Sequence, residues 1–339
     1  MRRLLLASAA LALLPLAAEA KVTSYLTGSA ADARPASLHG PVLNLGGGGP
    51  DVDSALQAMI DLTRGCTGGS SQCSTKVDVV ILRATGSNGY NDYIYAMNGV
   101  DSVETLVISK RTDTTSPALN ASIRAAEVVF FAGGDQCDYV TLFKGTPVET
   151  AVEYVLEQKH GAVGGTSAGM AIQSPTAYDA CVASVTSADI LANPYHRGAT
   201  FTHGFFDWPF MAGTITEQHL VTRDRMGRLM GFLARQIKDG YGSPQLGIAA
   251  DEQTSVVVDA NGLARVYGNP GAPSTAYFVL ADHAPGSGEK VAAKQPLSYA
   301  NFTFWKVPAG GTFDLANRPA SLGSYTISVS NGVLSANPY

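Results

Sequence analysis

Short apolar segments alternate with longer segments of helical periodicity over the first 250 residues of the chain. This alternation is typical of a parallel sheet covered by helices, whose strands are apolar throughout because both faces are buried. Strands are expected at residues 42–45, 77–82, 105–109, 128–132, 162–164 and 246–250. The pattern therefore predicts an α/β fold with a doubly wound, mostly parallel sheet and helices on both faces.

Helices are expected between these strands, for example at residues 53–63, 147–158 and 224–238. In the last of them, apolar residues recur at i, i+3, i+4, i+7 and i+11 from Met226 to Ile237, which is the pattern of a helix that buries one face. Arg225 and Arg228 fall outside that apolar stripe, so they belong to another face of the same helix.

The pattern changes at about residue 253, where turn residues begin to separate short strands. Residues 256–259 and 263–267 flank the turn Ala260-Asn261-Gly262 and predict a hairpin. Further strands are expected at 276–281, 302–307 and 325–329. We therefore expect an α/β domain over residues 21–259 and a β-rich extension over residues 260–339 that packs on the same domain.

The first twenty residues have the organisation of a signal peptide. Met1-Arg2-Arg3 is basic, residues 4–16 are apolar, and Ala18-Glu19-Ala20 is a typical cleavage site. Thirteen apolar residues are too few to span a bilayer, which needs about 20. We expect cleavage after Ala20 and a secreted or periplasmic protein without a membrane segment; the alternative is an uncleaved N-terminal anchor.

Composition narrows the class of protein further. Hydrophobic residues make up 45% of the chain and charged residues 15%, which excludes disorder as its main state. The net charge is −5, whereas a nucleic-acid-binding protein has an excess of basic residues. The sequence leaves the oligomeric state open, with a homodimer as one possibility.

Export places the four cysteines in an oxidising compartment. Cys66 and Cys73 lie in a polar segment rich in glycine and serine, and we expect them to form a disulfide that pins a surface loop. Cys137 and Cys181 are 44 residues apart, so both a disulfide and two buried thiols remain open. Since no C-x-x-C or H-E-x-x-H pattern occurs, neither a metal nor another cofactor is expected.

A candidate nucleophile follows the strand at 162–164. Gly165-Thr166-Ser167-Ala168-Gly169 matches G-x-S-x-G, the sharp strand-to-helix turn that exposes a serine hydroxyl above the sheet. Glycines suit the turn because a Cβ there would clash. The alternative is an ordinary turn in which Ser167 caps a helix.

A second polar cluster contains a candidate base. Glu217-Gln218-His219 is followed closely by Arg223, Arg225 and Arg228 in a chain that has few charges. A solvated basic surface is one interpretation. The histidine and the acidic and amide neighbours favour the other, a pocket for a substrate that carries carboxylate or guanidinium groups.

Four segments, in this order, resemble the cyanophycinase and dipeptidase E group of serine peptidases. They are Phe130-Phe131-Ala132-Gly133-Gly134-Asp135-Gln136, the Ser167 turn, Gln218-His219 with the following arginines, and Gly247-Ile248-Ala249-Ala250-Asp251-Glu252. The resemblance covers roughly residues 42–259 and implies a glutamine-amidotransferase-like fold. It also implies a Ser167–His219–Glu252 triad and a substrate pocket formed by Gln136, Glu217, Gln218, Arg223, Arg225 and Arg228.

The implied chemistry is that of a serine peptidase. Ser167 attacks a carbonyl, His219 transfers the proton, and Glu252 orients the imidazole. Backbone N–H groups of Gly134 and Ala168 are expected to form the oxyanion hole. The chain departs from the family at Glu217, where Asp is usual, and in the run Gly46-Gly47-Gly48-Gly49-Pro50, which lacks a nucleotide-binding pattern and is expected to be a tight turn beside the site.

Four functions follow from these observations. The first is an exported exopeptidase that releases β-Asp-Arg dipeptides from cyanophycin, a poly-aspartate that carries arginine on its side-chain carboxylates. The second is a periplasmic aspartyl or isoaspartyl dipeptidase of the same family. A secreted α/β-hydrolase esterase would use Ser167, Asp251 and His283 instead. A non-catalytic binding protein on the same scaffold is the fourth, and the intact triad argues against it.

Overall fold

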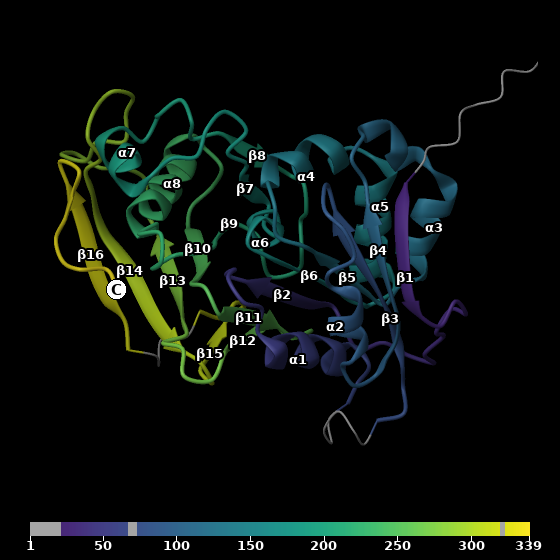
Figure 1. Ribbon diagram of the computed structural model, residues 1–339. Coiled ribbons are helices and arrows are strands. Elements are labelled where there is room, and N and C mark those ends of the chain that lie inside the picture. Colours follow the sequence, from purple (N-terminus) through teal and green to yellow (C-terminus); the bar gives the residue numbers. More distant parts are fainter. Residues whose placement is uncertain (1–21, 67–72, 319–322) are drawn as a thin grey trace, which may run out of the picture.

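Two β-sheets lie side by side in the computed structural model, which describes residues 22–66, 73–318 and 323–339 (Figure 1). Within those residues the first sheet has nine strands, in the order β1 (Thr23–Gly28), β4 (Val100–Val107), β3 (Val77–Arg83), β5 (Val128–Phe131), β6 (Ala162–Thr166), β2 (Val42–Gly46), β11 (Thr254–Val258), β12 (Leu263–Gly268) and β15 (Thr312–Asp314). The second sheet has eight, in the order β17 (Val333–Leu334), β16 (Tyr325–Ser330), β14 (Tyr299–Pro308), β13 (Thr275–Ala281), β10 (Gln245–Ala250), β9 (Thr214–Glu217), β7 (Thr176–Tyr178) and β8 (Phe201–His203).

The α/β class expected from the sequence is confirmed in the first sheet. Its central strands β4, β3, β5, β6 and β2 are parallel neighbours. Alternate residues of β3 face opposite sides, so Val79 and Ile81 belong to one buried cluster and Val80 and Leu82 to another. Antiparallel strands flank this parallel centre at both edges.

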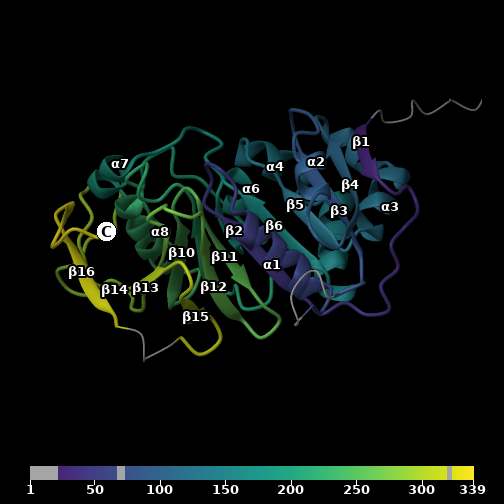
Figure 2. The same cartoon turned by 60° about the horizontal axis from the view of Figure 1, so that its bottom comes forward.

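Helices cover both faces of the first sheet. The side chains of α1 (Asp53–Thr63) and α2 (Asn91–Tyr95) pack on one face, and Figure 2 shows α1 lying over β2 and β6. The other face is covered by α3 (Pro117–Ala125), α4 (Gln136–Phe143) and α5 (Pro147–Glu153). A π-helical turn, Tyr154–Gln158, continues α5, so the helix expected at 147–158 is present but changes type.

The expected single sheet is wrong for residues 245–250. This strand, β10, pairs in parallel with β9 and antiparallel with β13, and both belong to the second sheet. The short strands β7, β8 and β9 that extend this sheet were not expected. With three or four residues each, they carry too little apolar pattern to be recognised.

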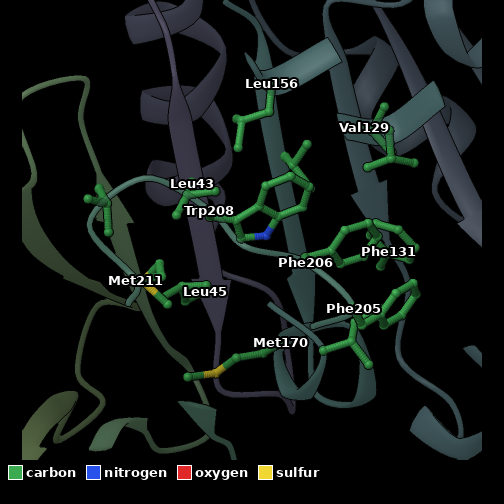
Figure 3. Close-up of a cluster of buried hydrophobic side chains, with 14 of the residues drawn as sticks. Leu43, Leu45, Val129, Phe131, Leu156, Met170, Phe205, Phe206, Trp208 and Met211 are labelled. Carbon is green, nitrogen blue, oxygen red and sulfur yellow. The ribbon is translucent and has the colours of Figure 1, made fainter. Parts of the chain in front are cut away.

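An aromatic segment between β8 and β9 packs into the core of the first sheet. Phe205, Phe206 and Trp208 are buried against apolar side chains from β2 and β5 (Figure 3). The indole N–H of Trp208 donates to Gln173 Oε1 at 2.8 Å. The chain that leads to the second sheet is thus anchored in the first.

Helix α8 (Met226–Lys238) packs against the second sheet through the apolar stripe expected from its sequence. It begins at Met226 and not at residue 224, because Asp224 has a φ of +46° and cannot start a right-handed helix. Its neighbour is the short helix α7 (Ser187–Ala192), whose N-cap Thr186 forms a capping box with Asp189.

The strands of the C-terminal third complete both sheets. The expected hairpin is present as β11 and β12 in the first sheet. Strands β13, β14 and β16 continue the second sheet beyond β10. The boundary that the sequence predicted after residue 259, between the α/β domain and the β-rich extension, lies in the turn of this hairpin.

No helix within the described residues is long and apolar enough to cross a membrane. The expected signal peptide, residues 1–20, lies outside the described part of the chain.

Two disulfides are present. Cys66 is linked to Cys73, as expected, and Cys137 is linked to Cys181, which the sequence left open. The described residues contain no free cysteine. The second link closes a loop of 44 residues and joins the first turn of α4 to the segment after β7.

Peptide mapping of the non-reduced mature protein should therefore find both linked pairs. Because the entropy cost of closing a loop grows with its length, loss of the 44-residue link should lower the free energy of unfolding by about 4 kcal/mol, against about 2 kcal/mol for Cys66–Cys73. Denaturant unfolding of the two double Cys→Ala variants measures the difference. Labelling of native protein by a thiol reagent would contradict the assignment.

Candidate active site

Ser167 lies at the turn from β6 into the short helix α6 (Ala168–Ala171). Its φ of +53° and ψ of −115° are rarely adopted by a residue with a side chain, and strain of this kind is a feature of nucleophile turns. A Cβ built on Gly165 would lie 2.5 Å from the carbonyl carbon of Gly169. A Cβ built on Gly169 would lie 2.2 Å from the carbonyl oxygen of Phe131. The glycines are therefore required by the close approach of the backbone on both sides of the serine.

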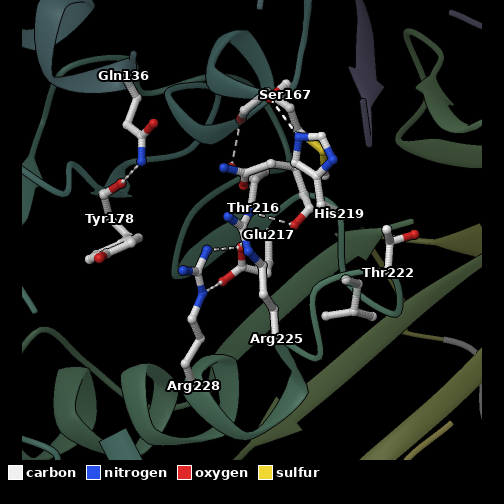
Figure 4. A network of polar contacts seen from close by, with 12 residues as sticks. Gln136, Ser167, Tyr178, Thr216, Glu217, His219, Thr222, Arg225 and Arg228 are labelled. Atoms are coloured by element: carbon white, nitrogen blue, oxygen red, sulfur yellow. Dashed lines mark hydrogen bonds and ion pairs between the residues drawn. The ribbon is translucent and has the colours of Figure 1, made fainter. Parts of the chain in front are cut away.

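The structure brings Ser167, His219 and Glu252 into one hydrogen-bonded row. Ser167 Oγ is 2.7 Å from His219 Nε2, and His219 Nδ1 is 2.7 Å from Glu252 Oε1. His219 and Glu252 follow the parallel neighbours β9 and β10, so both strands deliver their side chains at the same edge of the second sheet. Figure 4 shows His219 pointing toward Ser167, which comes from the first sheet.

The glycine-rich turn after β2 binds the backbone at Ser167, at His219 and at Gln253, the residue after Glu252. The carbonyl oxygen of Gly46 accepts from Ser167 N at 2.9 Å, that of Gly47 from His219 N at 2.8 Å, and that of Gly48 from Gln253 N at 2.9 Å. Gly48 has a φ of +101°, and a Cβ there would lie 2.3 Å from His219 Cε1. The sequence indicated a tight turn beside the site, but gave no signal for these three hydrogen bonds.

Of the residues around the expected oxyanion site, Ala168 and Gly133 lie next to Ser167. Ala168 follows Ser167 directly, and a Cβ built on Gly133 would be 3.6 Å from Ser167 Cβ. Gly134 is exposed, with no atom outside its chain neighbours within 4 Å of a Cβ built on it. A substrate carbonyl could therefore approach the backbone at this point.

Burial lowers the pKa of His219 from its ordinary value of 6.5. The positive charges of Arg223 and Arg225 lower this pKa further, whereas the hydrogen bond to Glu252 opposes the shift. His219 is 4% exposed and is therefore well shielded from water. The result is an imidazole that is neutral at pH 7, as a general base must be.

Glu217 and Arg228 form a buried ion pair under the site. Arg228 Nε and Nη2 donate to the two carboxylate oxygens of Glu217 at 2.8 and 2.6 Å. Arg228 Nη1 donates to the carbonyl oxygen of Val185 at 2.9 Å, and its guanidinium lies over the ring of Tyr178 at 4.9 Å. Both charged side chains are 2% exposed, so the charged groups of Glu217 and Arg228 contact each other and not the solvent (Figure 4).

Among the other expected pocket residues, Arg225 contacts this ion pair. Arg225 Nη1 donates to the carbonyl oxygen of Gln218 at 2.9 Å and lies 3.6 Å from Glu217 Oε1. Burial lowers the pKa of Arg225 to about 10, which leaves it protonated at pH 7. Arg223 is exposed. Gln136 Nε2 donates to the carbonyl oxygen of Tyr178 at 3.4 Å.

Tyr339 also supports the site, and the sequence gave no signal for it. Its hydroxyl has two acceptors for its one proton, Asp224 Oδ1 at 2.8 Å and Leu220 O at 3.3 Å, and it accepts from Met226 N at 3.2 Å. It thereby fixes the turn that carries Arg223 and Arg225.

The esterase alternative requires Asp251 and His283, and both are engaged elsewhere. Asp251 accepts from the backbone N–H groups of Val221 and Thr222 at 3.1 and 2.9 Å. His283 contacts Asp282 and Glu289 and stacks on Tyr299. Ser167 has His219 as its partner, so this geometry favours the peptidase arrangement.

Within the described residues, no group of three or more His, Cys, Asp or Glu side chains could hold a metal ion.

Comparison with known proteins yields cyanophycinases. The chain is 28% identical over 229 residues to those of Trichormus variabilis and Nostoc sp., an alignment that covers 66% of this chain and 69% of each relative. It is 26% identical over 179 residues to the cyanophycinase of Synechococcus elongatus, covering 53% of this chain and 50% of the relative. No family model matches the chain.

Two solved structures are similar at low identity. A peptidase from an acI-B1 actinobacterium has a TM-score of 0.49 at 18% identity and covers 70% of this chain and 94% of its own. A putative peptidase E from Listeria monocytogenes EGD-e has a TM-score of 0.41 at 12% identity, covering 68% and 98%. The sequence relatives agree with the order of motifs along the chain and support a peptidase similar to the cyanophycinase and dipeptidase E group.

Proposed function

We propose that this protein is an exported serine exopeptidase that hydrolyses cyanophycin to β-Asp-Arg dipeptides. The observation that carries the proposal is the row Ser167–His219–Glu252, with 2.7 Å at each step, in a relative of cyanophycinases. The two disulfides support export, because such links persist in oxidising compartments.

The reaction follows from the positions of these groups. Ser167 Oγ attacks the amide carbon while His219 Nε2 takes the hydroxyl proton, and Glu252 stabilises the resulting imidazolium through Nδ1. The oxyanion forms beside the N–H groups of Gly134 and Ala168. The C–N bond then breaks as His219 returns the proton to the leaving amine, and water hydrolyses the ester by the same route.

The ion pair between Glu217 and Arg228 changes the roles that the resemblance implies. Arg228 is bound to both oxygens of Glu217 and is therefore not available to a substrate. We assign recognition of substrate carboxylates to Arg225 and Arg223 instead. Gln136 and Gln218 remain as amide contacts at the edge of the same pocket. Glu217 and Arg228 then act as its floor and carry almost no net charge together.

An aspartyl or isoaspartyl dipeptidase of the same family is the second candidate, because the same row of Ser167, His219 and Glu252 would serve it. Incubation of the mature protein with insoluble cyanophycin and with free β-aspartyl dipeptides separates the two functions. Soluble β-Asp-Arg, identified by mass, supports the first; cleavage of dipeptides alone supports the second.

Ser167→Ala should abolish this release, with kcat reduced by about 10⁴ or more, while thermal unfolding stays close to that of the wild type. His219→Ala should cost a similar factor and add little to the serine change, since both residues serve one step. His283→Ala is the matched control and should be near neutral. If His283→Ala removed activity and His219→Ala did not, the esterase arrangement would replace the one proposed.

The pH dependence should report His219. Its pKa is lowered, and catalysis needs the neutral imidazole, so kcat/KM should fall only as the pH drops below 6.5. Arg223 contributes to that lowering, so Arg223→Ala should move the inflection toward higher pH. Initial rates between pH 4 and 9 at low substrate measure both. An inflection of the wild type above pH 6.5 would contradict the assignment.

Arg225 and Arg228 should respond differently to substitution. Arg228→Ala leaves Glu217 buried without its main partner and should lower the free energy of unfolding by about 3–5 kcal/mol. Arg225→Ala leaves that pair intact and should instead lower kcat/KM roughly 10- to 150-fold through the loss of a charge-assisted contact, with partial recovery in Arg225→Lys. Denaturant unfolding and steady-state kinetics on each variant distinguish the two effects. An Arg225→Ala protein within twofold of wild-type kcat/KM would refute the substrate contact.

A further inference from the structure

The Cys137–Cys181 disulfide joins two segments that border the proposed substrate pocket, the first turn of α4 and the segment after β7. Cys137 directly follows Gln136, in the first turn of α4 and three residues after Gly134. Cys181 belongs to the segment 178–185, which leaves β7 and runs to the carbonyl group that binds Arg228. The Cα atoms of the two cysteines are 5.0 Å apart.

Segment 178–185 is anchored at Tyr178 and Asp179, which accepts from the hydroxyl groups of Thr200 and Thr202, and again at Val185. Tyr178 is buried, its hydroxyl donates to Ala183 O at 3.1 Å, and it accepts from Val185 N at 3.0 Å. Residues 181–184 between these ends are exposed, and Val182 at their centre is 60% exposed. A segment with few buried contacts opens easily unless it is tied to the rest of the fold.

Contacts other than the disulfide between this segment and α4 are weak. Gln136 Nε2 reaches Tyr178 O at 3.4 Å, which is long for a hydrogen bond (Figure 4). Cys137 N and Cys181 N are each bound locally, to Asp135 and Asp179. The covalent bond is therefore the strongest link between α4 and this segment.

We propose that the Cys137–Cys181 disulfide is a positioning element for substrate binding, and that its reduction widens the pocket without disturbing the triad. The inference rests on the proposed function for the identity of the substrate. The triad is held separately, by the carbonyl groups of Gly46, Gly47 and Gly48, so binding and chemistry should respond independently.

The Cys66–Cys73 disulfide supplies a matched control in the same chain. The Cys66→Ala/Cys73→Ala protein retains only the link at 137–181, which dithiothreitol reduces to two thiols while the reagent is oxidised to its cyclic disulfide. The Cys137→Ala/Cys181→Ala protein lacks that link from the start. KM and kcat on a soluble oligomer of β-Asp-Arg are compared in all three proteins, with and without reductant.

The Cys137→Ala/Cys181→Ala protein should show KM raised at least fivefold, with kcat within about twofold of wild type. Reduction of the Cys66→Ala/Cys73→Ala protein should reproduce this rise, and before reduction its KM should match that of the wild type. Equal KM values with and without the 137–181 link would overturn the proposal. A wild type with no turnover would instead count against the proposed substrate.

Hydrogen exchange gives a readout that needs no substrate. Loss of the 137–181 link should speed exchange at residues 178–185 and 134–138 at least tenfold and leave the segment around Gly48 unchanged. Labelling of Ser167 by a small sulfonyl fluoride should proceed at the wild-type rate, since the triad is intact. Unchanged exchange in both segments would refute the positioning role, whatever the substrate is.

Discussion

Three successive backbone carbonyl groups, at Gly46, Gly47 and Gly48, hold the site together. They accept hydrogen bonds from the backbone N–H groups of Ser167, His219 and Gln253, the residue after Glu252. Ser167 and His219 come from two different sheets, and the turn links their backbones directly. Side chains are excluded from the turn, because the imidazole occupies the space beside Gly48.

The electrostatics of the pocket depend on a second buried arrangement. An isolated Arg228 or Glu217 would be very costly to bury, and the bidentate contact between them offsets that cost. Arg225 and Arg223 remain as net positive charge beside His219 and favour its neutral form. The same arginines that would attract a carboxylate also keep the base unprotonated.

Much of this site could be predicted from the sequence, because strand ends are local features. Ser167, His219 and Glu252 each follow an apolar strand or lie in a polar cluster, and the order of motifs resembles one family. The partner of Arg228 could not be predicted, since helical periodicity shows that an arginine leaves the apolar stripe but not what covers it. Here Glu217 and the carbonyl group of Val185 do so. The second sheet was missed for a related reason: β7, β8 and β9 are short and obtain their stability from neighbours distant in sequence.

The position of β2 has a consequence for the timing of activity. This strand is made early, yet it lies between β6 and β11, and its glycine turn contacts residues as late as Thr254. Eighty-five residues separate Ser167 from Glu252, which at about 5–20 residues per second corresponds to roughly 4–17 s of synthesis. His219 is made 52 residues after Ser167, and Glu252 is the last of the three to be made. The row Ser167–His219–Glu252 is therefore complete only after the last of these segments has been made and has docked.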